Sequence, residues 1–174
     1  MRVGLFGGSF NPIHSGHLGI AEKALAEWCL DLLLFIPAKV NPFKVGVSGT
    51  DVVGGLPDAV RWDLVTRVCA LNPKFRAWDV DLRRPSGPSY AIDTVREARR
   101  LYPAAELFWL IGEDNIADLP RWKDWETLKT LAHFIHFPRT PESSTEIRRR
   151  LAAGKSIADC VPPCVAARLA EIAL

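Results

Sequence analysis

Short apolar runs alternate with amphipathic stretches along most of the chain. Five of the apolar runs have the length and the composition of buried strands. Stretches with apolar positions three to four residues apart separate most of them, as in helices that pack on a sheet. We therefore predict an α/β fold, a Rossmann-like doubly wound parallel sheet of about five strands with helices on both faces. The predicted strands are Val3–Phe6, Leu32–Ile36, Phe75–Val80, Leu107–Ile111 and Phe134–Phe137.

Capping residues and prolines indicate where the helices begin and end. Ser143-Ser144-Thr145-Glu146 has the pattern of a capping box, and Gly154 is placed to end the helix that follows it. Ser89 suits an N-cap for a helix that runs to Tyr102-Pro103. The other predicted helices begin near Gly16, at Pro57 and at Pro162-Pro163.

Length and composition narrow the class of protein. With 174 residues, 48% of them apolar, the chain can close one sizeable core, so we predict a single domain over 1–174 with a C-terminal helical part at about 143–174. The 22 basic and 20 acidic residues give a net charge of +2, which argues against an extended nucleic-acid track. No apolar run approaches the ~20 residues that span a bilayer, and the N-terminus lacks a signal peptide, so we expect a cytoplasmic protein without membrane contact. The four cysteines lack Cys-x-x-Cys spacing and are expected to be free thiols.

The loop after the first predicted strand carries the strongest chemical signal, because parallel sheets bind ligands at the carboxyl ends of their strands. Gly7 and Gly8 permit a close approach of backbone to a ligand, and His14 and His17 fall at the start of the first helix. Helix amides and two imidazoles would thus face one anion. The glycines form neither the dinucleotide fingerprint nor a Walker loop, so hydride transfer and P-loop hydrolysis lose support. Binding of a phosphate group by another kind of loop remains as the interpretation.

Residues 7–17, Gly-Gly-Ser-Phe-Asn-Pro-x-His-x-Gly-His, resemble the signature of the His-x-Gly-His nucleotidyltransferase superfamily. The form is that of the nicotinate-mononucleotide adenylyltransferases. The chain resembles a short form of this family, because part of the usual segment between the fifth strand and the Ser-Ser-Thr helix is missing. Further blocks follow in the family's order, namely Asn41-Pro42-Phe43-Lys44, Ser89-Tyr90, Gly112-Glu113-Asp114, Leu119-Pro120-Arg121-Trp122 and the run from Ser143 to Arg148.

The resemblance implies transfer of AMP from ATP to the 5′-phosphate of nicotinate mononucleotide, which gives deamido-NAD and pyrophosphate. Such chemistry depends on alignment of the reactants and on donors placed where charge grows. The expected partners are ATP and a pyridine mononucleotide, without nucleic acid, and self-association into a homo-oligomer stays open. Mg²⁺ would arrive with ATP, held mostly by the nucleotide, because no carboxylate cage is visible in the sequence. His133 and His136 lie three apart on a strand, so they face opposite sides and would not share a metal.

The resemblance also implies roles for individual positions. It assigns catalysis to His14, His17, Lys44 and Arg148. It assigns ATP binding to these two histidines and Arg148 together with Gly7, Gly8, Ser9, Phe10, Gly112, Ser144 and Thr145. It assigns mononucleotide binding to Ser9, Lys44, Tyr90, Ala91, Asp114, Trp122 and Lys123.

Within the mononucleotide site, the resemblance implies that Trp122 stacks on the pyridine ring and Asp114 contacts ribose. Backbone amides near Ala91 and Lys123 would receive the nicotinate carboxylate. From the residues alone, Trp122 could equally cap the core, and Asp114 could cap a turn. Two alternative functions also stay open: a related nucleotidyltransferase with another acceptor, such as nicotinamide mononucleotide or phosphopantetheine, and a non-catalytic nucleotide-binding protein.

Overall fold

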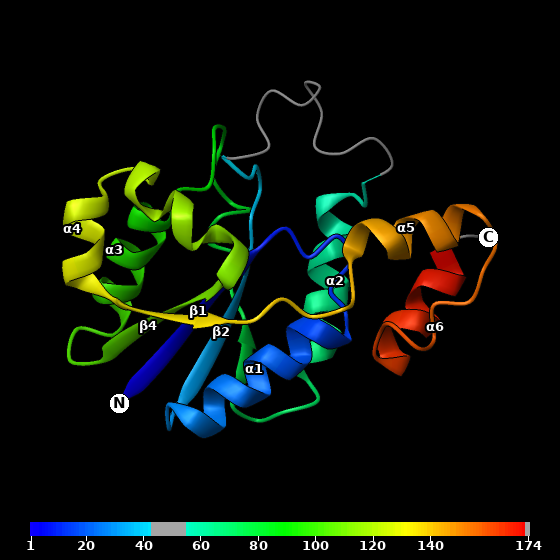
Figure 1. Cartoon of the computed structure of the whole chain (residues 1–174), viewed down its shortest axis with the longest axis horizontal. Helices are drawn as coiled ribbons and strands as arrows, with labels where there is room; N and C mark the ends of the chain where they lie inside the picture. The colour runs from blue at the N-terminus through cyan, green and yellow to red at the C-terminus, as the bar shows by residue number, and fades with distance from the viewer. Residues whose placement is uncertain (43–54, 173–174) are drawn as a thin grey trace.

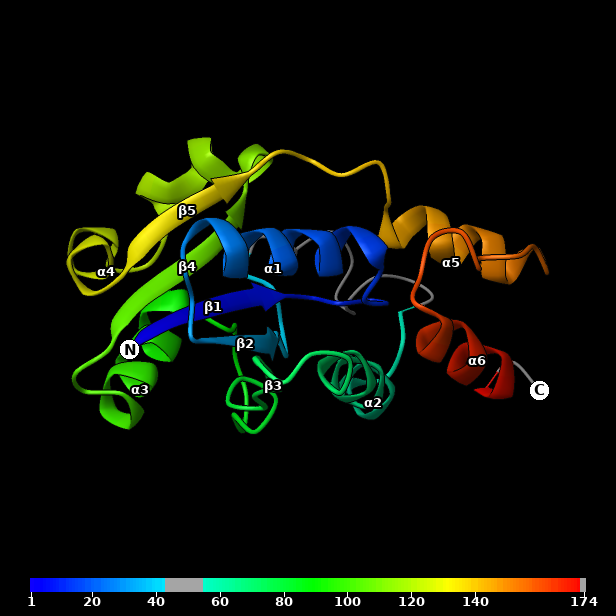
Figure 2. The same cartoon turned by 90° about the horizontal axis from the view of Figure 1, so that it is seen from below.

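A five-stranded parallel sheet forms the centre of the structure (Figure 1), and its strand order is β3-β2-β1-β4-β5 (Figure 2). The computed structural model describes residues 1–42 and 55–172. The first strand is central because its apolar run is buried on both faces and pairs with a neighbour along each edge. This confirms the predicted sheet. The strands are β1 (Arg2–Gly8), β2 (Leu32–Pro37), β3 (Phe75–Ala77), β4 (Glu106–Gly112) and β5 (His133–Phe137).

Helices cover both faces of this sheet, as predicted. Alternate side chains of β1 show the division: Phe6 packs with residues of α1, α2, α5 and α6, whereas Val3 and Leu5 pack with residues of α3 and α4. Figure 2 shows α1 and α3 on opposite sides of the sheet. The helices are α1 (Ser15–Glu27), α2 (Asp58–Cys69), α3 (Ala91–Leu101), α4 (Trp125–Leu131), α5 (Ser144–Ala152) and α6 (Pro163–Ile172), with a 3₁₀ helix η1 at Glu113–Arg121.

The C-terminal segment lies beyond the carboxyl ends of the strands. After β5 the chain runs without a further strand to α5, and α5 and α6 lie at the end of the molecule toward which the strand arrows point (Figure 2). Gly154 follows α5 with φ +63°, as its predicted role of ending the helix requires. The loop after β1 therefore contacts residues of α5 that lie more than 130 positions further along the chain.

Three local predictions were wrong. The third strand ends at Ala77 rather than Val80. The helix after Ser89 begins at Ala91 with Tyr90 as N-cap, because the Ser89 hydroxyl accepts the backbone N–H of Lys39 at 3.0 Å. The predicted capping box at Ser143 does not form. Its Glu146 carboxylate instead accepts hydrogen bonds from the guanidinium groups of two arginines in the same helix.

Two elements of the described chain were not predicted, η1 and α4. Both lie between β4 and β5, in or directly after an acidic and proline-containing segment. The four cysteines are free, as expected. Within residues 1–42 and 55–172, no helix has the length and apolarity needed to cross a membrane.

Candidate active site

An open cavity of about 650 Å³ lies at the carboxyl ends of β1 and β4. This is the edge of a parallel sheet where ligands bind, and the volume lies in the range of small-molecule sites. Twelve of the sixteen predicted site residues line it. They are Gly7, Gly8, Ser9, Phe10, His17, Tyr90, Ala91, Gly112, Asp114, Trp122, Lys123 and Ser144.

Of the remaining four predicted site residues, one lies outside the described part of the chain and three lie next to the cavity. Lys44 is outside the described residues, so its predicted contact with phosphate stays a prediction. His14, Thr145 and Arg148 are not on the cavity wall, but each is adjacent to it through a residue that is: His14 stacks on His17, and the other two belong to the helix that begins with Ser144. The structure therefore brings the described candidates to one end of the sheet.

The two glycines after β1 make room for the protein's own aromatic rings. A Cβ atom on Gly7 would lie 2.8 Å from the ring of Trp109, and one on Gly8 would lie 3.0 Å from the ring of Phe10. Sequence reasoning attributed these glycines to the approach of a ligand. Their backbones do line the cavity, yet the rings of Trp109 and Phe10 already require the absence of a side chain.

Phe10 holds the loop in a strained conformation. Its φ is +44°, a left-handed value that costs about 1–3 kcal/mol for a non-glycine residue. The ring is almost fully buried and packs edge-on against Phe6, 5.5 Å away, and His17, 5.0 Å away. Burial of this ring offsets the backbone strain and fixes the position of the His17 imidazole.

The two histidines form a compact pair at the start of α1. Their ring centres are 3.7 Å apart, and the backbone N–H of His14 donates to Nδ1 of His17 at 3.2 Å. A neutral imidazole whose Nδ1 accepts carries its proton on Nε2. His17 therefore presents an Nε2–H hydrogen-bond donor.

Both imidazoles are neutral at pH 7. Burial lowers the pKa of His14 to about 4, against a smaller opposing effect of the Glu142 carboxylate. Burial also holds the pKa of His17 well below its usual value, and the neighbouring His14 lowers it further. The pair can therefore offer hydrogen bonds to an anion without first carrying charge.

Helix α5 is fastened to the same loop from the far end of the chain. Arg148 donates from Nη1 to the carbonyl oxygen of Asn11 at 2.6 Å and from Nη2 to Thr145 Oγ1 at 3.2 Å. The hydroxyl of Ser144 donates to the carbonyl oxygen of Pro12 at 3.0 Å. Partial burial lowers the pKa of Arg148 below the usual arginine value, although the group stays charged. The N-terminus of α5 is thereby placed beside the loop that carries the histidines.

Sequence reasoning missed a second fastening, made by Arg61 of α2. This buried guanidinium donates to the carbonyl oxygens of Ser9 and Ala38 and pairs with Asp58. It thus joins the loop after β1 to the loop after β2. The contact between Arg61 and Ser9 spans 52 positions, and no local spacing in the sequence marks it.

Aromatic and acidic residues form the other end of the cavity. The ring of Trp122 lies edge-on to Trp109 at 6.1 Å and to Phe134 at 6.0 Å, so its orientation is set by packing. Asp114 is exposed, and its Oδ1 accepts a hydrogen bond from Asn115 at 2.9 Å. Trp122 both packs on neighbouring rings and lines the cavity, so the two interpretations of this residue are compatible.

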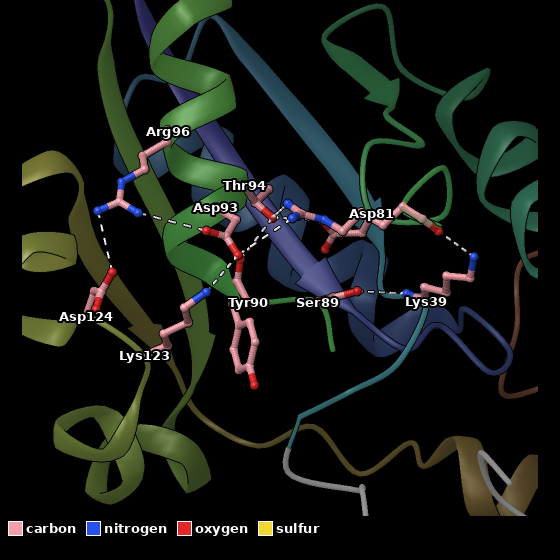
Figure 3. A network of polar contacts seen from close by, with 10 residues as sticks. Lys39, Asp81, Ser89, Tyr90, Asp93, Thr94, Arg96, Lys123 and Asp124 are labelled. Atoms are coloured by element: carbon pink, nitrogen blue, oxygen red, sulfur yellow. Dashed lines mark hydrogen bonds and ion pairs between the residues drawn. The ribbon is translucent and has the colours of Figure 1, made fainter. Parts of the chain in front are cut away.

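A buried polar network holds the turn before α3, and the sequence did not reveal it (Figure 3). Asp81 is 4% exposed and accepts a hydrogen bond from Thr94 Oγ1 at 2.8 Å. It also forms an ion pair with Arg84, whose Nε lies 3.1 Å from Asp81 Oδ1. Burial raises the pKa of Asp81, opposed by hydrogen bonds from Thr94, Arg84 and Ser89. Since Ser89 also accepts the backbone N–H of Lys39, the network connects the end of β2 to the start of α3.

The site holds no cluster of metal ligands in the described part of the chain. No group of three or more histidine, cysteine, aspartate or glutamate side chains is placed to hold a metal ion there. On β5, the two histidines three positions apart are both exposed.

Comparison with known proteins agrees with this geometry. The cytidylyltransferase-like family matches residues 5–150. A Thermus thermophilus protein named a probable nicotinate-nucleotide adenylyltransferase is 41% identical over 184 residues, which cover 95% of this chain and 94% of that protein. A Shouchella clausii protein of the same name is 40% identical and covers 94% of this chain and 91% of its own length.

A solved structure shares the fold. Plasmodium falciparum nicotinic acid mononucleotide adenylyltransferase, complexed with NaAD, superposes with a TM-score of 0.72 at 16% identity and covers 99% of this chain and 96% of its own. The fold, the position of the cavity and the sequence matches all indicate the same family. The chain belongs to the cytidylyltransferase-like family, in the group of the nicotinate-nucleotide adenylyltransferases.

Proposed function

We propose that this chain transfers the adenylyl group of ATP to nicotinate mononucleotide in NAD biosynthesis. An oxygen of the mononucleotide 5′-phosphate bonds to the α-phosphorus of ATP, and the bond from that phosphorus to the bridging oxygen of pyrophosphate breaks. The products are deamido-NAD and pyrophosphate. One observation carries the proposal: a single cavity has the histidine loop at one end and an aromatic wall with Trp122 at the other.

Phe10, His17 and Ser144 line the phosphate end of the cavity, and His14 and Arg148 lie next to it. His17 Nε2–H would donate to a phosphate oxygen of ATP, with His14 stacked behind it. The N-terminus of α5 adds unpartnered first-turn amides, which favour an anion. These groups are fixed before the nucleotide arrives, so little reorganisation opposes stabilisation of the charge that develops on pyrophosphate.

Arg148, Thr145 and Lys44 belong to the same proposal with different support. Arg148 holds the loop through the Asn11 carbonyl oxygen, donates to Thr145 and is half-buried. Thr145 is exposed at the first turn of α5. Lys44 follows β2 in the sequence, so a contact with phosphate from that side of the cavity rests on the resemblance alone.

The pyridine end of the cavity comprises Tyr90, Ala91, Asp114, Trp122 and Lys123. Trp122 would stack on the pyridine ring, and Asp114 would accept hydrogen bonds from ribose hydroxyls. Ala91 is the first residue of α3, where backbone N–H groups lack partners within the helix and the helix dipole favours a carboxylate. An amide in place of the carboxylate would turn an NH₂ group toward these donors.

Mg²⁺ fits this site as part of the nucleotide substrate. The described residues offer no cluster of ligands, so the triphosphate and water would supply most of the coordination. When bound, the ion would neutralise charge on the phosphate oxygens. The chain's own contribution is then to hold the triphosphate beside the His17 donor and α5.

A pyrophosphate-release assay tests the proposal. With MgATP and a panel of acceptor phosphates, nicotinate mononucleotide is expected to give the highest kcat/KM, about ten- to a hundredfold above nicotinamide mononucleotide. Phosphopantetheine is expected to give no pyrophosphate above background. Nucleotide binding without pyrophosphate release from any acceptor would contradict the proposal and establish a non-catalytic binding protein.

A further inference from the structure

Lys123 is one of the residues that line the cavity, and its ammonium group points toward the start of α3 (Figure 3). Its Nζ is 3.4 Å from Asp93 Oδ2 and 4.6 Å from the centre of the Tyr90 ring, above the ring face. Tyr90 is the N-cap of α3 and also lines the cavity. A positive charge is therefore held against the turn where the proposed function places the acid group of the substrate.

Asp93 does not depend on Lys123 for compensation of its charge. Its carboxylate lies 3.6 Å from Arg84 Nη1 and 3.9 Å from Arg96 Nη1, so three cations face one acid. We call Asp93, Arg84, Arg96 and Lys123 the Asp93 cluster. Of its three cations, Lys123 alone lines the cavity. Its charge can turn to a ligand while both arginines continue to neutralise Asp93.

We propose that the Lys123 side chain determines the preference for an acid over an amide acceptor, by pairing its ammonium with the nicotinate carboxylate. The proposal rests on the proposed function and adds a side-chain contact to the backbone amides near Ala91. Trp122, the preceding residue, would carry the pyridine ring, so the two adjacent side chains would act on one substituted ring. An ammonium gains a charge-assisted hydrogen bond from a carboxylate that a neutral amide does not supply.

The arrangement around Lys123 explains how the ammonium reaches the ligand without strain. The Lys123 side chain is 45% exposed, so its head group can move. Its contact with the face of the Tyr90 ring keeps the ammonium near the cavity wall. Lysine is a flexible point charge, unlike the planar fork of arginine, and suits a carboxylate whose plane is set by stacking on another residue.

Three variants test this role in the assay with both mononucleotides. Lys123→Met removes the charge and keeps an unbranched side chain over Tyr90. Lys123→Arg keeps the charge. Arg96→Met is the matched control, because it removes an equally exposed cation from the Asp93 cluster at a position that does not line the cavity. For each protein, kcat/KM is measured for nicotinate and for nicotinamide mononucleotide at saturating MgATP.

The expected result is a change confined to the acid substrate. Lys123→Met should lower kcat/KM for nicotinate mononucleotide about tenfold and leave the value for nicotinamide mononucleotide within about twofold. Lys123→Arg and Arg96→Met should retain most of the acid preference. If Lys123 served only in packing, Lys123→Met would lower kcat/KM for both mononucleotides by the same factor.

The outcomes separate failure of this proposal from failure of the proposed function. If the parent protein prefers the acid and Lys123→Met keeps that preference, the backbone amides suffice and the role of Lys123 is overturned. An equal loss in Arg96→Met would also overturn it, since any cation of the Asp93 cluster would then act. If the parent releases no pyrophosphate with either mononucleotide, the proposed function itself is overturned before the variants are compared.

Discussion

The two ends of the cavity differ in how their polar groups are held. At the phosphate end, His14 is buried and His17 half-buried, both are neutral, and backbone carbonyl oxygens accept the hydrogen bonds of Arg148 and Ser144. At the pyridine end, the Asp93 cluster is made of part-exposed charged side chains that pair with one another. The first arrangement is held by buried contacts and suits the recognition of an anion through fixed donors. The second is adjustable and suits a choice between similar ligands.

Loss of one fixed donor should have the largest effect. His17→Ala removes the Nε2–H group and is expected to lower kcat by about 10²–10³ at a temperature where the variant is folded. Because the ring packs on Phe6 and Phe10, the melting temperature should also fall. The control is His136→Ala, at an exposed position of β5 that does not line the cavity, and it should retain full activity. More than a tenth of the parent kcat in His17→Ala would show that the loop does not act on the phosphates.

The buried neutral histidines should make stability depend on pH. In the unfolded chain the pKa of His14 is near 6.5, and burial lowers it to about 4, so at lower pH the unfolded state binds protons that the folded state does not. The free energy of unfolding should fall as the pH drops from about 6.5 to about 4, by about 3 kcal/mol for His14 alone. Urea unfolding across this range measures the slope, which His14→Phe should reduce and His136→Phe should not.

The fastening of α5 to the histidine loop can be broken without loss of charge. Arg148→Lys keeps the cation and loses the fork that reaches both Asn11 and Thr145, so turnover should fall about 10- to 100-fold. The control is Arg149→Lys, an exposed residue whose partner is Glu146 in the same helix. Initial rates at saturating substrates compare the two variants. Equal losses would mean that the three consecutive arginines form only a charged helix face.

The buried network behind the pyridine end should give the smallest effect. Thr94→Val deletes the hydroxyl that donates to Asp81 and keeps the side-chain volume, at a cost of about 1–2 kcal/mol in the free energy of unfolding. We expect KM for the mononucleotide to rise about threefold with KM for ATP unchanged, because only the turn before α3 is affected. A matched rise in both KM values would mean that Thr94 supports the whole cavity. Thr66→Val, on an exposed turn of α2, serves as the control.

The same contrast decides how much of the site could be predicted from the sequence. The phosphate end lies largely within residues 7–17, so its glycines, asparagine-proline turn and histidines carry a local pattern that can be recognised. The strands and their parallel pairing were also predictable, because the strands are short apolar runs separated by helical stretches. These features depend on neighbouring positions.

The contacts that could not be predicted join distant positions. Arg61 reaches Ser9 and Ala38, and Asp81 reaches Thr94, through side chains whose spacing has no periodicity. The capping box failed for a related reason, since charged arginine partners compete for Glu146 more strongly than a backbone N–H does. The 3₁₀ helix packs on β4 and β5, and α4 packs on α3 and β5, so both elements also depend on contacts outside their own segment.

The central position of β1 also has a consequence for the order of assembly during synthesis. Its pairing with β2 needs only the next thirty or so residues, but Val3 pairs with Leu107 on β4, which the ribosome adds about 5–20 s later at ordinary elongation rates. Until then one edge of β1 has no strand beside it, directly before the loop that carries the histidines. The nascent chain must therefore carry its central strand half-assembled through most of translation, and the histidine loop can take its final shape only after α5, near the end of synthesis, reaches Asn11.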